Sequence, residues 1–160
     1  MISLKFYKEE DFPELDYVLD TIQSQFTATA KQTLEKIKER NLNKDFLAYP
    51  VSIFDDGKAA GFFVIDFGKD KFEFTENNDS ALIRSLSINP DFQGKGIGKQ
   101  AMIEVDYFIK NHFPDCNEIV LAVNEANTLA FQLYIKTGYV YEGKVKEGRC
   151  GSQYQMSKKL

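Results

Sequence analysis

The segment Arg84–Met102, RSLSINPDFQGKGIGKQAM, places three glycines at alternate positions between a strand-like run and a helix-like run. The chain has only 10 glycines in 160 residues, and a connection that merely turns a corner needs one or two of them. A third glycine indicates a backbone that another molecule approaches closely. Amides in the first turn of a helix have no carbonyl partner, and the helix dipole adds partial positive charge beside them. The segment is therefore a candidate phosphate-binding loop.

Two familiar phosphate-binding patterns fit this loop poorly. A Walker loop would need glycine at position 93 and serine or threonine at position 100, where the chain has Gln93 and Gln100. The dinucleotide fingerprint has the spacing G-x-G-x-x-G, whereas Gly94, Gly96 and Gly98 form G-x-G-x-G far from the start of the chain. A tight strand-to-helix turn without a ligand stays open as an alternative.

The composition is that of a folded globular chain, and the length favours one domain over residues 1–160. Hydrophobic residues make up 43% of the chain, which includes 14 Phe and 8 Tyr. The formal charge is −4 and the basic residues are scattered, so we expect neither a nucleic-acid partner nor a membrane partner. The acidic balance is compatible with a cationic small partner.

Few residues offer a membrane anchor, a cross-link or a metal site. No apolar run is long enough for a signal peptide or a membrane span. Cys116 and Cys150 are too few and too far apart for a disulfide or metal framework. His112 is the single histidine, which excludes a metal site built from several imidazoles. We expect no metal, and a soluble protein of the reducing cytoplasm.

Hydrophobic periodicity predicts a mixed sheet covered by helices, an α/β (α+β) fold. Asp56-Gly57 joins two apolar runs as a hairpin. Pro50 cannot donate to a ladder, so the first of these runs should lie at a sheet edge or be interrupted. Residues 71–80 are ambiguous, with a strand followed by a loop as one reading. The expected strands are residues 2–6, 46–54, 58–68, 81–88, 118–123, 139–143 and 152–158, and the expected helices are residues 11–20, 29–41, 98–111 and 127–138.

A second block, residues 122–143 (AVNEANTLAFQLYIKTGYVYEG), follows the loop. Together the two blocks resemble the GCN5-related N-acetyltransferase (GNAT) superfamily, whose members use acetyl-CoA. The loop pattern of that family, Gln/Arg-x-x-Gly-x-Gly/Ala, is matched by Gln93, Gly96 and Gly98. The resemblance covers roughly residues 45–145 and implies a mixed, mostly antiparallel central sheet flanked by helices. The family's later helix pattern, Asn-x-x-Ala-x-x-Leu-Tyr-x-x-x-Gly-Phe/Tyr, is matched at every position, by Asn127, Ala130, Leu133, Tyr134, Gly138 and Tyr139.

The resemblance implies where acetyl-CoA, the co-substrate, binds. Its pyrophosphate would lie on the amides of residues 93–99. Its pantetheine arm would lie beside residues 82–88, where two neighbouring strands splay apart and expose the amides of Leu86 and Ile88. One such amide would polarise the thioester carbonyl. The implied cofactor-binding residues are Leu86, Ser87, Ile88, Gln93, Gly94, Lys95, Gly96, Ile97, Gly98, Lys99, Asn124 and Asn127.

Tyr134 is the implied catalytic residue, which donates a proton to the departing CoA thiolate. Its position also fits a core aromatic on an amphipathic helix, since Leu129, Leu133 and Tyr134 share a stripe. Asn127 fits a helix N-cap as well as a contact to pantetheine, and the two roles are compatible.

The implied reaction is an N-acetyl transfer in which a primary amine attacks acetyl-CoA directly, through a tetrahedral intermediate. The amine must be neutral to attack, so a carboxylate is the expected base, yet residues 81–88 contain none. The candidates lie in the preceding strand and loop, and each also fits a solvated loop acid: Asp66, Glu73, Glu76 and Asp79.

A small amine or polyamine is the favoured acceptor, because the chain looks most like bacterial spermine and spermidine acetyltransferases. Acetylation of a protein N-terminus or of another amine stays open, as do a non-catalytic acyl-CoA sensor and a homodimer. The tail from Glu142 onward is expected to complete the sheet and line the acceptor side. Arg149 and Cys150 are expected at the surface, without an assigned role.

Overall fold

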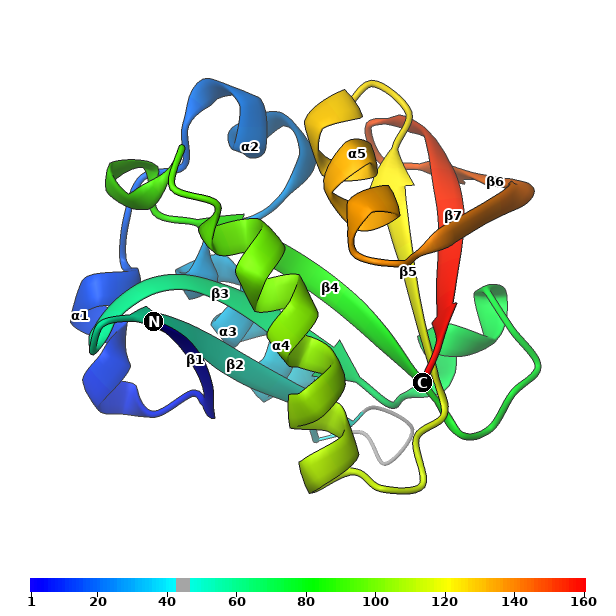
Figure 1. Ribbon diagram of the computed structural model, residues 1–160, viewed down its shortest axis with the longest axis horizontal. Coiled ribbons are helices and arrows are strands. Elements are labelled where there is room, and N and C mark those ends of the chain that lie inside the picture. The colour runs from blue at the N-terminus through cyan, green and yellow to red at the C-terminus, as the bar shows by residue number, and fades with distance from the viewer. Residues whose placement is uncertain (43–46) are drawn as a thin grey trace.

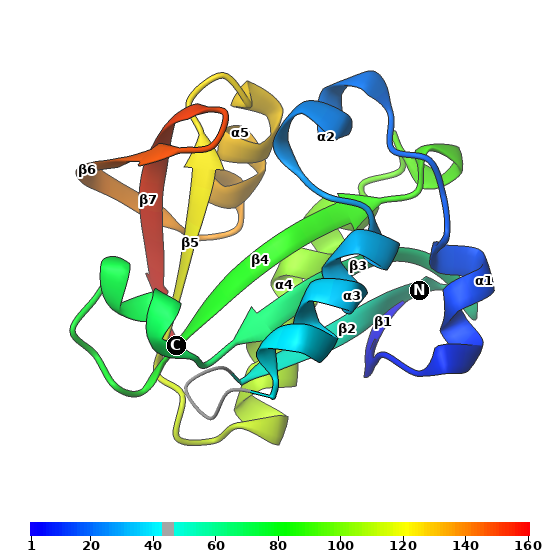
Figure 2. The same ribbon diagram turned by 180° about the vertical axis from the view of Figure 1, so that it is seen from behind.

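The structure, a computed structural model, describes residues 1–42 and 47–160, and in it a single sheet separates two groups of helices (Figures 1 and 2). The described strands are β1 (Ile2–Phe6), β2 (Ala48–Asp55), β3 (Lys58–Asp66), β4 (Ser80–Ile88), β5 (Glu118–Asn124), β6 (Val140–Gly148) and β7 (Gly151–Lys159). The described helices are α1 (Phe12–Leu15), α2 (Thr21–Phe26), α3 (Ala30–Arg40), α4 (Ile97–His112) and α5 (Thr128–Lys136), with short 3-10 turns η1 (Glu9–Asp11), η2 (Lys69–Glu73) and η3 (Pro90–Phe92). Residue 46, the first of the second expected strand, lies outside the described residues.

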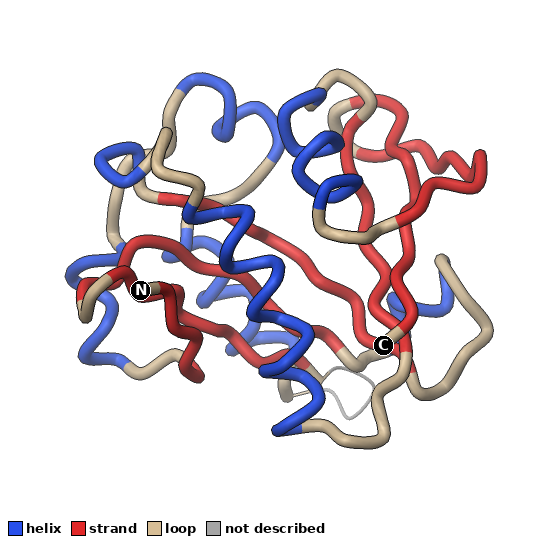
Figure 3. The backbone as a smooth tube through the Cα atoms, viewed as in Figure 1, coloured by secondary structure: helices blue, strands red, loops and turns tan. Residues whose placement is uncertain are grey.

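The strands of the described sheet follow the order β1-β2-β3-β4-β5-β7-β6 (Figure 3). The β4–β5 pair is parallel, and the other five pairs are antiparallel. The expectation of a mixed, mostly antiparallel sheet flanked by helices is therefore confirmed. The tail completes the sheet, as expected, because β7 inserts between β5 and β6.

Helix α4, close to the expected range 98–111, buries an apolar stripe against one face of the sheet. Those side chains pack in the main hydrophobic core with strand residues such as Phe63 and Ile119. Burying each large apolar side chain contributes roughly 1.5–3 kcal/mol. The opposite face carries a smaller core in which Leu15 and Ile37 pack on Phe62. The buried stripe of α4 includes Ala101, Met102, Val105, Phe108 and Ile109.

The helix expected over residues 11–20 is wrong as one element. Helix α1 ends at Leu15 because Asp16 has a non-helical backbone (φ −83°, ψ 57°). The side chain of Asp20 then starts a new helix, α2, by accepting a hydrogen bond from the Gln23 amide at 2.8 Å. The strand considered for residues 71–80 is also wrong, because 3-10 turn η2 runs to Glu73 and the next strand begins at Ser80.

Pro50 does not place β2 at a sheet edge, because β2 lies between β1 and β3. The β1–β2 register ends at Phe6 opposite Val51, so Pro50 lies one residue past the last residue pair. Its carbonyl accepts a hydrogen bond from the Tyr7 amide at 2.9 Å, but without an N–H the proline cannot return a bond to the Tyr7 carbonyl. The β1–β2 ladder is therefore interrupted at Pro50, the second of the two expectations, whereas the pairing of β2 with β3 continues through Pro50.

Strands β4 and β5 pair over only three residue pairs, from Ser80–Glu118 to Leu82–Val120, and then diverge. Beyond that point the β3–β4 register passes from Arg84 to Ser87, so Ser85 and Leu86 form a bulge opposite a single residue of β3. Ser85 has φ 61°, a left-handed conformation that is unusual for a residue other than glycine. The expected splay between two neighbouring strands is therefore present.

Candidate active site

The three glycines of the loop serve two different purposes. Gly94 (φ 77°) and Gly96 (φ 75°) have left-handed backbones, and Gly96 is the N-cap of α4. A Cβ atom added at either position would meet no atom within 4 Å, so open space lies beside the first turn of α4. Gly98 instead permits α4 to approach α5, because a Cβ there would lie 3.1 Å from Cδ1 of Leu133. The exposed start of α4 fits a diphosphate held by main-chain amides.

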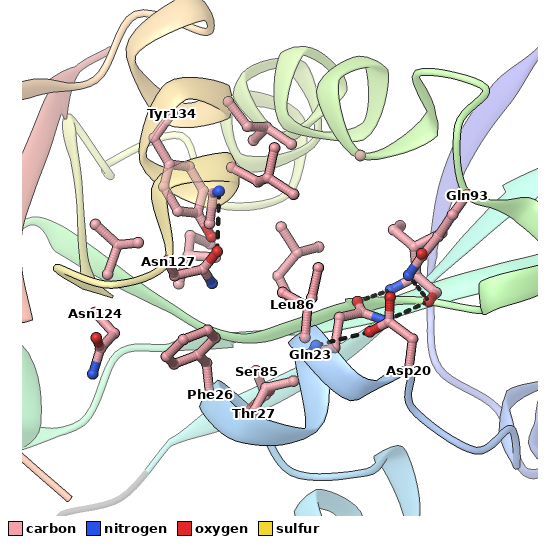
Figure 4. Close-up of a pocket in the computed structure, with 18 of the residues that line it drawn as sticks. Asp20, Gln23, Phe26, Thr27, Ser85, Leu86, Gln93, Asn124, Asn127 and Tyr134 are labelled. Carbon is pink, nitrogen blue, oxygen red and sulfur yellow. Dashed lines mark hydrogen bonds between the residues drawn. The ribbon is translucent and has the colours of Figure 1, made fainter. Parts of the chain in front are cut away.

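A cavity of about 520 Å³ begins at this loop and runs between α2 and α5 along β4 (Figure 4). We call it the cofactor cleft. Its described lining also includes Phe26, Ala122, Arg149 and Cys150. Most of the implied site residues line it, namely Leu86, Ile88, Gln93, Gly94, Gly96, Ile97, Gly98, Lys99, Asn124, Asn127 and Tyr134.

Two implied cofactor-binding residues lie outside the lining of the cofactor cleft. Ser87 is buried, and its hydroxyl shares a 2.6 Å hydrogen bond with the Tyr17 hydroxyl. The Lys95 ammonium lies 5.4 Å from the centre of the Phe92 ring, a cation–π contact on the loop. Ser87 therefore holds the segment between α1 and α2 to the sheet.

Tyr134 lines the cofactor cleft although only 7% of the residue is exposed. Burial raises the pKa of its phenol to about 12, because the charged phenolate would lose its hydration. The ring contacts Tyr139 edge-on, with the ring centres 5.6 Å apart. The position therefore combines a core contact with a cleft-facing hydroxyl that keeps its proton at neutral pH.

The two asparagines of the second block hold the backbone around the cleft. Asn127 is the N-cap of α5, because its Oδ1 accepts a hydrogen bond from the Ala130 amide at 3.2 Å. Asn124 accepts a hydrogen bond from the Ala126 amide and donates one to the Cys150 carbonyl, each at 2.9 Å. Asn124 therefore ties the end of β5 to the β6–β7 turn.

The amide of Ile88 is not exposed as expected, because the side chain of Gln23 occupies it (Figure 4). The Gln23 carboxamide accepts from the Ile88 amide and donates to the Ile88 carbonyl, both at 2.9 Å. Gln93 donates a longer hydrogen bond, 3.3 Å, to the same carbonyl. No local pattern predicts the contact, since Gln23 and Ile88 are 65 residues apart in the chain.

A second cavity, of about 480 Å³, lies beside α3. We call it the acceptor cavity. Ile83, Arg84 and Ser85 line both this cavity and the cofactor cleft, so the two spaces meet at the bulge of β4. The rest of the described lining comes from α2 and the link to α3, from α3, from β3, β4 and β5, from the segment around η2, and from the β6–β7 hairpin, so part of the tail lines this cavity.

Of the candidate bases, only Glu73 lines the acceptor cavity. Asp66 is fully buried, where its carboxylate binds Arg84 at 3.0 Å and accepts from the Gly68 amide. Glu76 and Asp79 are exposed and lie outside the lining of both cavities. The structure therefore separates Glu73 from the other three.

Asp70 also lines the acceptor cavity, although no sequence pattern singles it out. Burial alone would raise its pKa, but hydrogen bonds from Arg40 and Arg84, each 2.8 Å long, outweigh burial and lower the pKa. Arg84 in turn binds both Asp66 and Asp70. Asp70 is therefore a structural anion, because a carboxylate held by two guanidinium groups is a weak base.

Within residues 1–42 and 47–160, no three His, Cys, Asp or Glu side chains gather in a way that could hold a metal ion. None of the helices in the same ranges has the length and apolarity to cross a membrane.

Comparison with known proteins identifies the family. The model of the Acetyltransferase (GNAT) family matches residues 15–139. YbbJ of Bacillus subtilis, an uncharacterized N-acetyltransferase, is 38% identical over 157 residues, which cover 95% of this chain and 93% of that protein. The spermine/spermidine N(1)-acetyltransferase of the same organism is 27% identical over 82% of each chain. The solved structure of AAC(6')-Ib with paromomycin and acetyl-CoA has a TM-score of 0.79 and 18% identity, covering 99% of this chain and 93% of that one. The chain therefore belongs to the acetyltransferase (GNAT) family of acetyl-CoA-dependent N-acetyltransferases.

Proposed function

We propose that the chain transfers an acetyl group from acetyl-CoA directly to a small primary amine. The coenzyme lies in the cofactor cleft and the amine in the acceptor cavity. The observation that carries this proposal is the junction of the two cavities at Ile83, Arg84 and Ser85. Because β5 has already diverged from β4 there, a molecule in the cofactor cleft can contact a molecule in the acceptor cavity at the bulge.

Residues that line the two cavities would supply the groups that acyl transfer needs. The amide of Leu86, which belongs to the bulge and lines the cleft, would donate to a carbonyl that becomes negatively charged. The Tyr134 hydroxyl keeps its proton and can give it to a departing thiolate. Glu73, at 56% side-chain exposure, is the candidate that accepts a proton from the amine, directly or through water.

The proposal is tested by mixing the chain with acetyl-CoA and a panel of amines, and by measuring free CoA and acetylated product by chromatography. Release of CoA that depends on the amine supports an enzyme. Tight binding of acetyl-CoA with no amine-dependent release overturns the proposal in favour of a non-catalytic sensor. Chromatography is preferable to a thiol reagent, because the Cys150 thiol of the protein is itself exposed.

Replacing Gln23 with alanine is expected to tighten acetyl-CoA binding. The pantetheine arm, which carries amide groups, would pair with the main chain of Ile88 that Gln23 now occupies. Two net hydrogen bonds of about 1 kcal/mol each would no longer compete, so calorimetry should show an affinity up to about thirtyfold higher. Gln25→Ala is the matched control, because Gln25 is exposed on the same helix and outside the cleft. Weaker binding by Gln23→Ala alone would show that Gln23 supports the bound state.

A further inference from the structure

The acceptor cavity is rich in positive charge, although the whole chain carries a net charge of −4. Two of its lining side chains are anionic, Asp70 and Glu73. Its five cationic lining side chains are Lys36, Arg40, Arg84, Lys146 and Arg149. The excess of cations is therefore local to this cavity and opposite in sign to the average of the chain.

Each carboxylate at the cavity already has a cationic partner. Asp70 binds Arg40 and Arg84, both at 2.8 Å. Glu73 binds Lys146 at 2.5 Å. The buried carboxylate of Asp66 lies behind the cavity and takes a further share of the Arg84 charge. In the described part of the chain each lining carboxylate is therefore already paired, and Glu73 can take the proton-accepting role proposed above only when its exposed pair with Lys146 opens.

Two cations of the lining differ from the rest. The side chains of Lys36, on α3, and Arg149, in the β6–β7 turn, are exposed and have no hydrogen bond or ion pair with any residue in the ranges 1–42 and 47–160. Arg149 lines both cavities, so it lies near their junction, whereas Lys36 lines the acceptor cavity alone. Each of the two side chains is available to bind an anionic group within the acceptor cavity.

This charge arrangement disfavours a polyamine. A polycation would have to displace Arg40, Arg84 or Lys146 from its carboxylate, or lie beside Lys36 and Arg149, and like charges in contact lower affinity. The names of the spermine/spermidine relative and of the aminoglycoside complex therefore do not extend to this cavity. An amine that also carries a negative charge would instead be attracted by Lys36 and Arg149.

We propose that the acceptor is a small primary amine that carries an anionic group, a carboxylate in the first place, and that Arg149 and Lys36 bind that group. The proposal rests on the function proposed above, since it assumes that the amine is acetylated from the acceptor cavity. An amino acid is the simplest molecule that satisfies both requirements. A phosphorylated amine also combines an amino group with an anionic group, and the experiment below distinguishes it from an amino acid.

The test compares amines in matched pairs at saturating acetyl-CoA: an amino acid with its methyl ester, phosphoethanolamine with ethanolamine, and spermidine alone. Values of kcat/KM are expressed per concentration of unprotonated amine, because esterification also changes the pKa of the amine. We expect the anionic member of a pair to be at least about tenfold better, as a charge-assisted hydrogen bond provides. The pair with the larger ratio tells a carboxylate from a phosphate. The proposal would be overturned if spermidine, the methyl ester or ethanolamine reacted as well as the anionic amines.

Variants locate the anion-binding residues. Lys36→Gln and Arg149→Gln are each expected to lower kcat/KM for the anionic amine about tenfold, mainly through KM, and to lower it much less for the partner amine that lacks the anionic group. Arg149→Lys should restore part of the loss. The control is Lys38→Gln, since Lys38 is exposed on the same helix as Lys36 and outside both cavities. Equal losses for charged and uncharged amines would overturn the assignment of these residues. Acetyl-CoA that binds but releases CoA with no amine of any charge would instead overturn the proposed enzymatic function.

Discussion

Replacing Tyr134 with phenylalanine is expected to lower kcat by about a hundredfold or more, in the range of a lost general acid. The change removes one hydroxyl from a buried ring and leaves the contact with Tyr139 in place. Because the hydroxyl acts only as the thiolate departs, KM and the affinity for acetyl-CoA should change little. Steady-state kinetics and calorimetry on the same preparation check both parts.

Tyr139→Phe is the matched control for that variant. Tyr139 is the neighbouring tyrosine, it is buried, and its hydroxyl has no hydrogen-bond partner in the described part of the chain. Removing an unpartnered buried hydroxyl is expected to leave kcat unchanged and to cost no stability. A similar fall in kcat for both variants would mean that the ring packing matters and would remove the acid role from Tyr134.

The pKa of Tyr134 gives this prediction a pH dependence. Burial raises the pKa from 10.0 to about 12, so the protonated form, which is the acid, is present at every pH below that value. The attacking amine, by contrast, loses its proton as the pH rises. We expect kcat/KM to rise with pH up to about 10, where amines are largely neutral, without a descending limb from Tyr134. A descending limb in the wild-type protein that Tyr134→Phe abolishes would contradict the raised pKa.

Replacing Gly96 with glutamate is expected to weaken acetyl-CoA binding by about a hundredfold or more. A side chain at Gly96 would enter the open space beside the first turn of α4, where no atom lies within 4 Å of an added Cβ. A carboxylate there would meet the diphosphate of the coenzyme, and such like-charge contacts cost about 3 kcal/mol or more. Calorimetry with acetyl-CoA and with CoA measures the loss.

Gly57→Glu separates the charge effect from backbone strain. Gly57 has φ 85°, close to the φ of 75° at Gly96, and a Cβ there also meets no atom within 4 Å. It lies in the β2–β3 turn, away from both cavities. Both variants should lose about 1 kcal/mol of folding stability from the left-handed backbone. Unchanged affinity of Gly96→Glu for acetyl-CoA would count against the loop as the phosphate site.

Local patterns in the sequence predicted the elements that hold the cofactor side. The apolar stripe of α4, the Asn127 cap and Gly138 after α5 depend on residues within a few positions of one another. The glycine spacing predicted an open helix start, and Gly94 and Gly96 provide it. The role of Gly98 was not predictable, since it depends on contact with Leu133 in another helix.

The acceptor side was not predictable, because it is assembled from distant segments. Gln23 reaches Ile88 across 65 positions, and α3, η2 and the β6–β7 hairpin meet only in the folded chain. The acidic pI of about 5.1 permits a cationic substrate, but net charge averages the whole surface. Three carboxylates at or behind the cavity, Asp66, Asp70 and Glu73, are used by the protein's own cations. The proposal of an anionic amine rests on the two lining cations that remain, Lys36 and Arg149.

The short pairing of β4 with β5 is a weak point in the hydrogen bonding of the sheet. Within the sheet only three residue pairs join β4 to β5, whereas β2 and β3 pair along their length, and the main hydrophobic core packs against both parts. Native-state amide hydrogen exchange should therefore resolve two cooperative units, with earlier opening at this seam than in the β2–β3 hairpin. A ligand that contacts both blocks should slow exchange on both sides together and raise the melting temperature. Bound coenzyme would thus stabilise the seam between the β1–β4 part and the β5–β7 part of the sheet.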